Sequence, residues 1–163
     1  MTFVYRNTCF TYAFRGGRSM MKMDKRTGEL TDELIKTKQI SDYLSDNADE
    51  MLNTDLGGYL TALMEKAGLN RSSLAVKAGL NRFYIYDIFS GRKNPSADKL
   101  ICIALALQAD LEETQILLRL ADRAGLYVRH PRDSVLIFAI QRHLSVDETN
   151  ALLYEAGQRL LTE

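Results

Sequence analysis

The sequence predicts an all-helical protein. Leu, Ala, Glu, Lys and Arg dominate its 163 residues, which include only 2 prolines and no tryptophan, and this balance favours helices. Apolar side chains recur three and four positions apart along much of the chain, which is the spacing of one helix face. Residues able to cap or end a helix stand at the ends of these stretches. With 46% hydrophobic and 26% charged residues, the chain is able to bury a core and is not of disordered composition.

The first 23 residues are interpreted as a disordered leader. Residues 1–19 mix aromatics with threonines and end in a run of Arg and Gly just before two methionines. Because Arg and Gly codons can be purine-rich, this run is consistent with a translated ribosome-binding site, and the natural start is then Met20, Met21 or Met23. A short strand or a floppy arm explains the same residues equally well.

An acidic helical segment is expected from 24 to 54. Thr31 is the predicted N-cap of its first helix. Ile40, Tyr43 and Leu44 follow at the spacing i, i+3, i+4, which predicts the apolar face of a second short helix.

Four helices are expected from 55 to 108. Asp55 is able to cap the first of them and Gly68 to end it. Gly91 ends the third. The expected helices are 55–68, 72–78, 82–90 and one opened by Asn94-Pro95-Ser96 whose apolar face runs from Leu100 to Leu107.

Residues 109–163 are expected to form a helical extension, with helices at about 112–124, 132–142 and 147–158. Part of this extension repeats itself at a constant offset of 35. The matching residues are Glu113-Thr114, Leu117-Leu118, Ala121 and Leu126 against Glu148-Thr149, Leu152-Leu153, Ala156 and Leu161. Two copies are too few for a solenoid, so we interpret them as two similar helix-turn units.

The charge of the chain is unevenly distributed although its formal net charge is zero. Residues 60–100 carry seven bases against three acids. Acids exceed bases by nine to five in residues 20–59 and by nine to six in residues 101–163. A basic middle between acidic flanks indicates a local anion-binding surface, which the net charge hides.

Residues 71–90 have the spacing of two short helices that cross at a steep angle. Ala75 supplies a small side chain where the second helix passes over the first, and Gly79 tolerates the left-handed backbone of the turn. Asn81 is able to cap the second helix. The apolar anchors of that helix, expected to point inward, are Ile85, Ile88 and Phe89.

This stretch resembles the Cro and phage-repressor (XRE-type) helix-turn-helix family. The matching residues are Leu74, Ala75, Ala78, Gly79, Leu80, Ile85 and Ile88, followed by Gly91 and Pro95-Ser96. The resemblance covers about 56–108, roughly a third of the chain. It implies an all-α, lambda-repressor-like helix-turn-helix bundle at 55–108, with additional antiparallel helices at the C-terminus. It also implies a recognition helix at 82–90 that lies in the major groove of duplex DNA.

The resemblance and helix geometry together name the residues expected to contact DNA. The outward positions of the recognition helix are Arg82, Phe83, Tyr86 and Asp87. Arg82 is placed to bind guanine O6 and N7, a contact worth roughly 1–3 kcal/mol of discrimination, and Phe83 to contact a thymine methyl. Asp87 would face phosphate or accept from cytosine N4. The remaining expected contacts are Asn81, which matches a contact position of the family, and Arg71, Arg92 and Lys93 near backbone phosphates.

Other interpretations of these residues stay open. Arg82, Arg92 and Lys93 also fit solvated helix-end and loop cations. Phe83, Tyr84 and Tyr86 fit ordinary packing against the N-terminal segment, and an aromatic outward face is also typical of a protein-binding hot spot. The second functional hypothesis is therefore an adaptor that keeps the helix-turn-helix fold and binds a protein partner through its aromatic face and C-terminal helices.

No catalytic or metal-binding pattern is recognised, so neither an enzyme nor a cofactor is expected. His130 and His143 lack nearby ligands at metal spacing, and the segment from His130 to Ser134 fits a helix start better than a nucleophile site. Cys102 is expected to be a buried hydrophobe, and two separated cysteines without a disulfide or zinc pattern fit a reducing cytoplasm. No apolar run approaches membrane-spanning length, and no signal peptide is recognised.

The sequence thus favours a cytoplasmic bacterial transcription regulator that binds double-stranded DNA. A homodimer is left open; its half-sites would lie about 34 Å apart. With about four to six phosphate contacts per dimer, the logarithm of its affinity would fall against that of salt with a slope of about −4 to −5.

Overall fold

The computed structural model describes residues 25–162, which are helical and contain no strand. The prediction of an all-α fold that contains a helix-turn-helix is confirmed. The chain divides into two compact units, Met1–Asn53 and Thr54–Glu163, and each is described by itself. The leader expected at 1–23, with Cys9 and the candidate starts Met20, Met21 and Met23, lies outside the described residues.

The described part of the first unit is a pair of short helices, α1 (Thr27–Lys36) and α2 (Ile40–Asp46), followed by a 3₁₀ turn at Ala48–Glu50. Lys25 links α1 to the end of α2. Its Nζ lies 2.7 Å from Oε2 of Glu33 on α1 and donates to Oδ1 of Asn47, the residue after α2, at 2.8 Å. The hydrogen bond with Lys25 also lowers the pKa of the Glu33 carboxyl.

The prediction that Thr31 caps the first helix is wrong. The helix begins four residues earlier, at Thr27. Glu29 accepts a bond from the backbone N–H of Arg26 at 2.9 Å, which satisfies a free donor at this end. Thr31 lies inside the helix, where its hydroxyl donates to the carbonyl of Thr27 at 2.8 Å.

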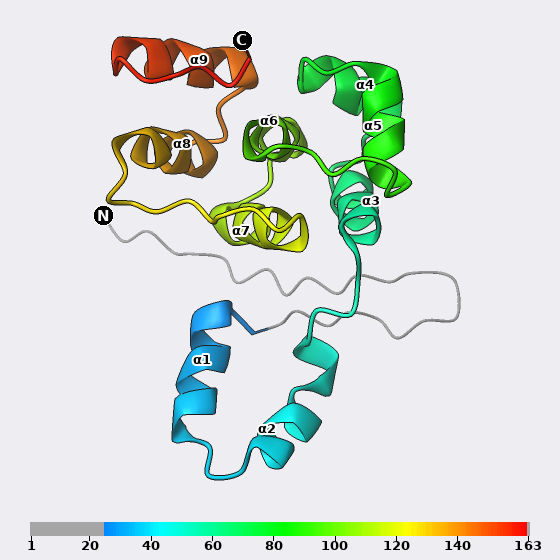
Figure 1. The fold of residues 1–163 in the computed structure, drawn as a ribbon, viewed down its shortest axis with the longest axis vertical. Helices are drawn as coiled ribbons and strands as arrows, with labels where there is room; N and C mark the ends of the chain where they lie inside the picture. The colour runs from blue at the N-terminus through cyan, green and yellow to red at the C-terminus, as the bar shows by residue number, and fades with distance from the viewer. Residues whose placement is uncertain (1–24, 163) are drawn as a thin grey trace. The chain divides into compact units, whose positions relative to one another are not determined.

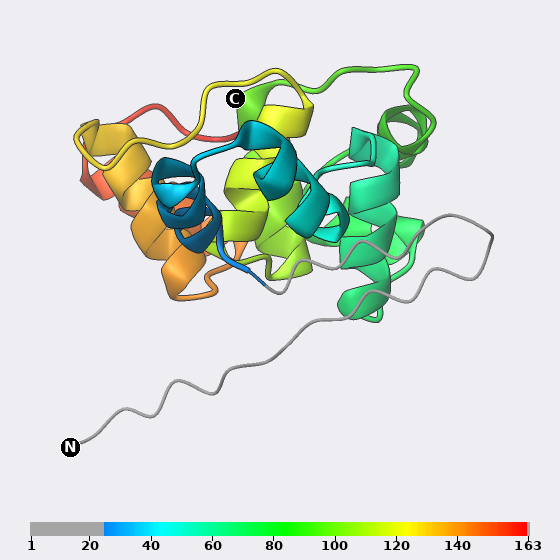
Figure 2. The ribbon, with the colours of Figure 1, turned by 90° about the horizontal axis from the view of Figure 1, so that it is seen from below.

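The second unit contains seven helices, of which α6 lies at the centre. Helix α6 lies between α4 and α5 on one side and α8 and α9 on the other (Figures 1 and 2). Every residue of α6 from Leu100 to Leu107 is buried, which explains its nearly unbroken apolar sequence. The helices are α3 (Leu56–Lys66), α4 (Arg71–Lys77), α5 (Arg82–Phe89), α6 (Ala97–Leu107), α7 (Leu111–Leu120), α8 (Pro131–Gln141) and α9 (Val146–Glu155).

Local capping chemistry sets the ends of the helices around the turn. The expected cap Asp55 accepts from the backbone N–H of Gly58 at 2.7 Å, and the expected cap Asn81 accepts from that of Phe83 at 2.8 Å. Gly79 ends the turn between α4 and α5 with φ = +62°, a left-handed conformation that costs glycine little. The predicted caps Asp55 and Asn81 and the predicted turn at Gly79 are confirmed, and the helices lie within two residues of their expected bounds.

Two helices of the extension end earlier than expected, α7 at Leu120 and α9 at Glu155. Each is followed by a residue in the left-handed region, Asp122 (φ = +55°) and Gly157 (φ = +63°), which turns the chain out of the helix. Apolar spacing beyond these points belongs to the extended segments that follow. The expected ends near 124 and 158 are therefore four and three residues too late.

His130 and Ser134, two of the residues considered for catalytic or metal chemistry, take part in a helix start. Ser134 donates its hydroxyl to the carbonyl of Val128 at 2.5 Å and to that of His130 at 3.1 Å, and Pro131 occupies the first turn of α8. Within residues 25–162, no three His, Cys, Asp or Glu side chains cluster as metal ligands would. None of the helices in that range has the length and apolarity needed to cross a membrane.

Candidate nucleic-acid interface

Helices α4 and α5 pack through small and branched side chains, as the spacing of 71–90 predicts. Ala75 on α4 is 3% exposed, and Ile85 and Ile88 on α5 are fully buried. Phe89 is only half-buried. The two isoleucines, three residues apart, hold one face of α5 against α3 and α4, and the opposite face is left outward.

Phe83 lies at the centre of the outward face of α5. Successive residues of a helix are about 100° apart, which places Phe83 opposite the buried isoleucines, with Tyr86 and Asp87 beside it. The Phe83 side chain is 79% exposed, Arg82 is exposed, and Tyr86 and Asp87 are half-buried. The structure thus brings the four predicted outward residues onto one face, and an exposed aromatic ring forms its middle.

Two arginines stack on the Tyr86 ring. The Arg71 guanidinium, at the start of α4, lies 5.2 Å from the centroid of that ring and 5.0 Å from the centroid of Phe89. Arg82 lies 5.6 Å from the Tyr86 centroid and donates to the phenol oxygen at 3.5 Å. This hydrogen bond and the charge of Arg82 hold the pKa of the Tyr86 phenol below its usual value. Both cations are positioned by one ring rather than moving freely in solvent.

Asp87 forms an ion pair with Arg92 of the same chain. Its carboxylate lies 2.9 Å from Nη2 of Arg92 and accepts from Nε of the same residue at 3.0 Å. Its carbonyl accepts from the backbone N–H groups of Arg92 and Lys93, at 2.9 and 3.1 Å. The acid that the sequence placed opposite phosphate or cytosine is therefore neutralised by a residue that was expected to bind phosphate.

Lys93 lies on the other flank of the outward face, with its Nζ 5.8 Å from the ring centroid of Tyr84. Tyr84 and Tyr86 are two positions apart and so stand on opposite sides of Phe83. Cations consequently border the exposed face of α5 on both sides: Arg71 and Arg82 beside Tyr86, and Lys93 beside Tyr84. Asn81 stands at the N-terminal end of the face, where its side chain is used as the cap of α5.

Two residues that shape this face escaped the sequence analysis. Gly57 lets α3 approach the last carbonyl of α5 so closely that a Cβ atom there would collide with the oxygen of Phe89. Tyr84 is interpreted above as an aromatic that packs against the N-terminal segment, and the spacing does not indicate its contact with Lys93. A glycine in an otherwise regular helical stretch is the signal that could have found Gly57, because glycine costs stability there and so usually has a packing reason.

Comparison with known proteins agrees with this geometry. Residues 55–117 match a family model described as a helix-turn-helix domain. No curated protein and no solved structure matches the chain. The matched range begins just before α3, includes the α4–α5 pair and ends within α7. The chain therefore contains a helix-turn-helix domain. In its α4–α5 pair, the second helix, α5, presents an aromatic face bordered by cations.

Proposed function

We propose that the protein is a transcription regulator that binds double-stranded DNA sequence-specifically, with α5 in the major groove. The observation that carries this proposal is that cations border the exposed face of α5 on each side, Arg71 and Arg82 on one and Lys93 on the other. A helix lying in the major groove has a phosphate backbone on each side. Arg71 and Lys93, on opposite flanks, are assigned to the two backbones, and Arg82 and Phe83 to base edges.

An unbiased selection of duplexes at two salt concentrations tests this proposal. We expect a shared motif to be enriched, and we expect affinity to fall steeply with salt because bound cations displace counterions from DNA. With about two to three phosphates per bound chain, the log–log slope should be about −2 to −3 for each copy. A random pool after selection, or binding that does not change with salt, would contradict the proposal.

Replacing Asp87 with asparagine is expected to tighten DNA binding a few-fold on all sequences alike. The change removes the partner of Arg92, which frees one cation for phosphate and makes the salt slope steeper by about one. Fluorescence anisotropy on cognate and scrambled duplexes measures both quantities. Asp122→Asn is the matched control, because it changes the net charge equally at an exposed left-handed position that asparagine tolerates. Loss of sequence preference without a gain in affinity would instead assign Asp87 to base contact.

Tyr86 is expected to act by positioning Arg71 and Arg82. Tyr86→Phe keeps the ring on which both guanidinium groups stack and should bind DNA within about twofold of the wild type. Tyr86→Leu removes the ring and should weaken binding by about tenfold, because both arginines then lose their fixed position. Equal losses in the two variants, measured at one salt concentration, would show that the phenol oxygen matters and the ring does not.

The adaptor hypothesis keeps one specific observation in its favour, which is the 79% exposure of Phe83 at the centre of the face. A protein partner that buries this ring would bind in a manner insensitive to salt. Phe83→Ala would then abolish binding and Arg82→Ala would leave it nearly unchanged. On DNA we expect the reverse order, since Arg82 contributes charge as well as base contact.

A further inference from the structure

The helix pair α8–α9 is a second copy of the pair α6–α7, and the repetition is wider than the sequence indicated. Helix α9 begins and ends 35 residues after α7 begins and ends. Both helices start with a capping box, formed by Asp110 and Glu113 in α7 and by Ser145 and Glu148 in α9. The same offset therefore relates their sequence and their local hydrogen bonding.

The segments after the two helices repeat as well. The backbone N–H of Leu126 donates to the side chain of Gln115 at 2.9 Å, and that of Leu161 donates to the side chain of Asn150 at 2.8 Å. In each copy, a side-chain amide on the helix (α7 or α9) binds the segment that folds back along it. The left-handed residues that end the two helices, described above, are also 35 positions apart.

Helices α6 and α8 extend the repeat towards the N-terminus. Each is followed by a left-handed residue, Gln108 (φ = +57°) directly after α6 and His143 (φ = +53°) two residues after α8, and these are again 35 positions apart. The three buried side chains of α8 correspond in type and nearly in volume to buried side chains of α6. The corresponding pairs are Ile101 and Leu136, Ala104 and Ala139, and Leu105 and Ile140, all buried.

The two pairs contact each other in a reciprocal way. Helix α8 packs against α7, and α9 packs against α6. Exchanging the two copies converts the first contact into the second, which is the contact pattern that a two-fold relation between the copies gives. That relation is the rule of an isologous dimer, in which the same surface is used by both partners, here realised within one chain.

We infer that α8–α9 occupies the place that the α6–α7 pair of a second copy would take in a homodimer. The whole chain is then a monomer. When α8–α9 is removed, the face of α6–α7 that it covers becomes a homodimer interface. The α6–α7 pair and the α8–α9 pair that covers it have similar apolar side chains at the corresponding positions named above. A second α6–α7 pair therefore fits where α8–α9 now lies. This inference concerns α6–α9 and does not depend on whether α5 binds DNA.

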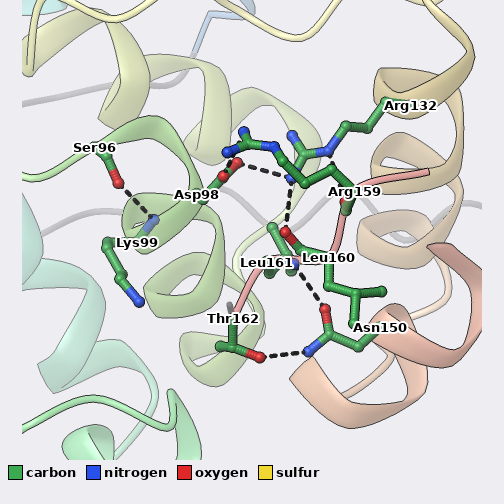
Figure 3. Close-up of polar contacts among 9 residues, drawn as sticks. All are labelled: Ser96, Asp98, Lys99, Arg132, Asn150, Arg159, Leu160, Leu161 and Thr162. Atoms are coloured by element: carbon green, nitrogen blue, oxygen red, sulfur yellow. Dashed lines mark hydrogen bonds and ion pairs between the residues drawn. The ribbon is translucent and has the colours of Figure 1, made fainter. Parts of the chain in front are cut away.

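A one-sided ion-pair cluster explains why the internal pairing is preferred. The carboxylate of Asp98, in the first turn of α6, lies 2.9 Å from Nη2 of Arg132 on α8 and 2.7 Å from Nη2 of Arg159 after α9 (Figure 3). Arg132 Nε also donates to the carbonyl of Arg159 at 2.9 Å. Asp98 and Arg132 are only 15% and 20% exposed, so the pair is partly shielded from solvent.

This cluster breaks the internal symmetry. Thirty-five positions before Arg132 and Arg159, the chain has Ala97 and Ala124. A second copy of α6–α7 would therefore bring two alanines to Asp98 and leave its carboxylate without these arginines. The internal cover is held by contacts that a second chain does not offer, and this difference selects the monomer.

The reactivity of the Cys102 thiol shows whether α8–α9 has moved away from α6. Cys102 follows Asp98 by four positions and so lies on the same stripe of α6, and its thiol is fully buried. Burial raises the pKa of this thiol to about 11, and the charges of Lys99, Asp98 and Arg132 also act on it. In a Cys9→Ser background it is the only cysteine, and a thiol reagent should reach it when α8–α9 moves away.

The first experiment compares the full chain with a chain that ends after Val128, by analytical ultracentrifugation. We expect the full chain to sediment as a monomer and the shortened chain as a dimer, and we expect Leu105→Glu to return the shortened chain to a monomer. A full chain that sediments as a dimer overturns the inference. So does a shortened chain that is helical by circular dichroism and monomeric at all concentrations.

The second experiment uses the full chain only, in case the shortened one does not fold. Asp98→Ala should speed the modification of Cys102 by roughly tenfold to a hundredfold, the effect of losing charged hydrogen bonds, and should produce dimers that increase with concentration. Asp147→Ala, an exposed acid in the first turn of α9, is the matched control and should change neither. Faster modification of a chain that stays monomeric, or no faster modification, overturns the inference.

Discussion

Gly57→Ala is expected to destabilise the protein by about 1–3 kcal/mol. A Cβ atom at this position of α3 would collide with the carbonyl oxygen of Phe89, the last residue of α5. That oxygen belongs to the backbone, so it moves only if α3 and α5 separate. Gly57 is the second residue of α3, so the gain that alanine brings there is at most the roughly 1 kcal/mol of a helix interior, and the strain outweighs it. Urea unfolding followed by circular dichroism measures the difference.

Gly58→Ala is the neighbouring control for this prediction. A Cβ atom there would collide only with the hydroxyl oxygen of Thr54, a side chain that can rotate away, and the capping carboxylate of Asp55 would need to shift by only a few tenths of an ångström. We expect a change of less than about 1 kcal/mol, because the helix propensity of alanine offsets a small adjustment. If Gly57→Ala were as stable as the wild type, the close approach of α3 and α5 would be wrong.

The parts of the fold that depend on local chemistry were predictable from the sequence. Asp55 and Asn81 are caps because their side chains reach backbone N–H groups two or three residues later, whatever the rest of the chain does. Gly79 marks the turn because its backbone conformation is costly for other residues. The helix-turn-helix followed from these positions and from the inward spacing of Ile85 and Ile88.

The parts that depend on distant residues were not predictable in this way. The approach of Gly57 to Phe89 and the bond between Asp98 and Arg159 join residues that only the folded chain brings together. The pairing of Asp87 with Arg92 is local but competes with solvent and DNA, so spacing alone does not decide it. The repeat was visible in α7 and α9, where identical letters recur. It was hidden in α6 and α8, where few identical letters recur and the correspondence lies mainly in the buried side chains.

Arg82→Ala and Lys93→Ala are expected to weaken DNA binding in different ways. Arg82 is assigned to a guanine edge, so its loss should cost about 1–3 kcal/mol on the cognate duplex and much less on a scrambled one. Lys93 is assigned to phosphate, so its loss should weaken both duplexes equally and reduce the salt slope by about one. The measurement is anisotropy on both duplexes at several salt concentrations, for each variant and the wild type.

The position of the two side chains makes this comparison decisive. Arg82 is held on the Tyr86 side of the exposed face and Lys93 on the Tyr84 side, so neither substitution removes the other's contact. Lys77, an exposed cation at the end of α4 outside these two stacks, is the control for charge alone, and Lys77→Ala should change affinity least. If Arg82→Ala lowered affinity for cognate and scrambled duplexes by the same factor, Arg82 would be a phosphate contact, and sequence reading would have to come from Phe83 or Asn81.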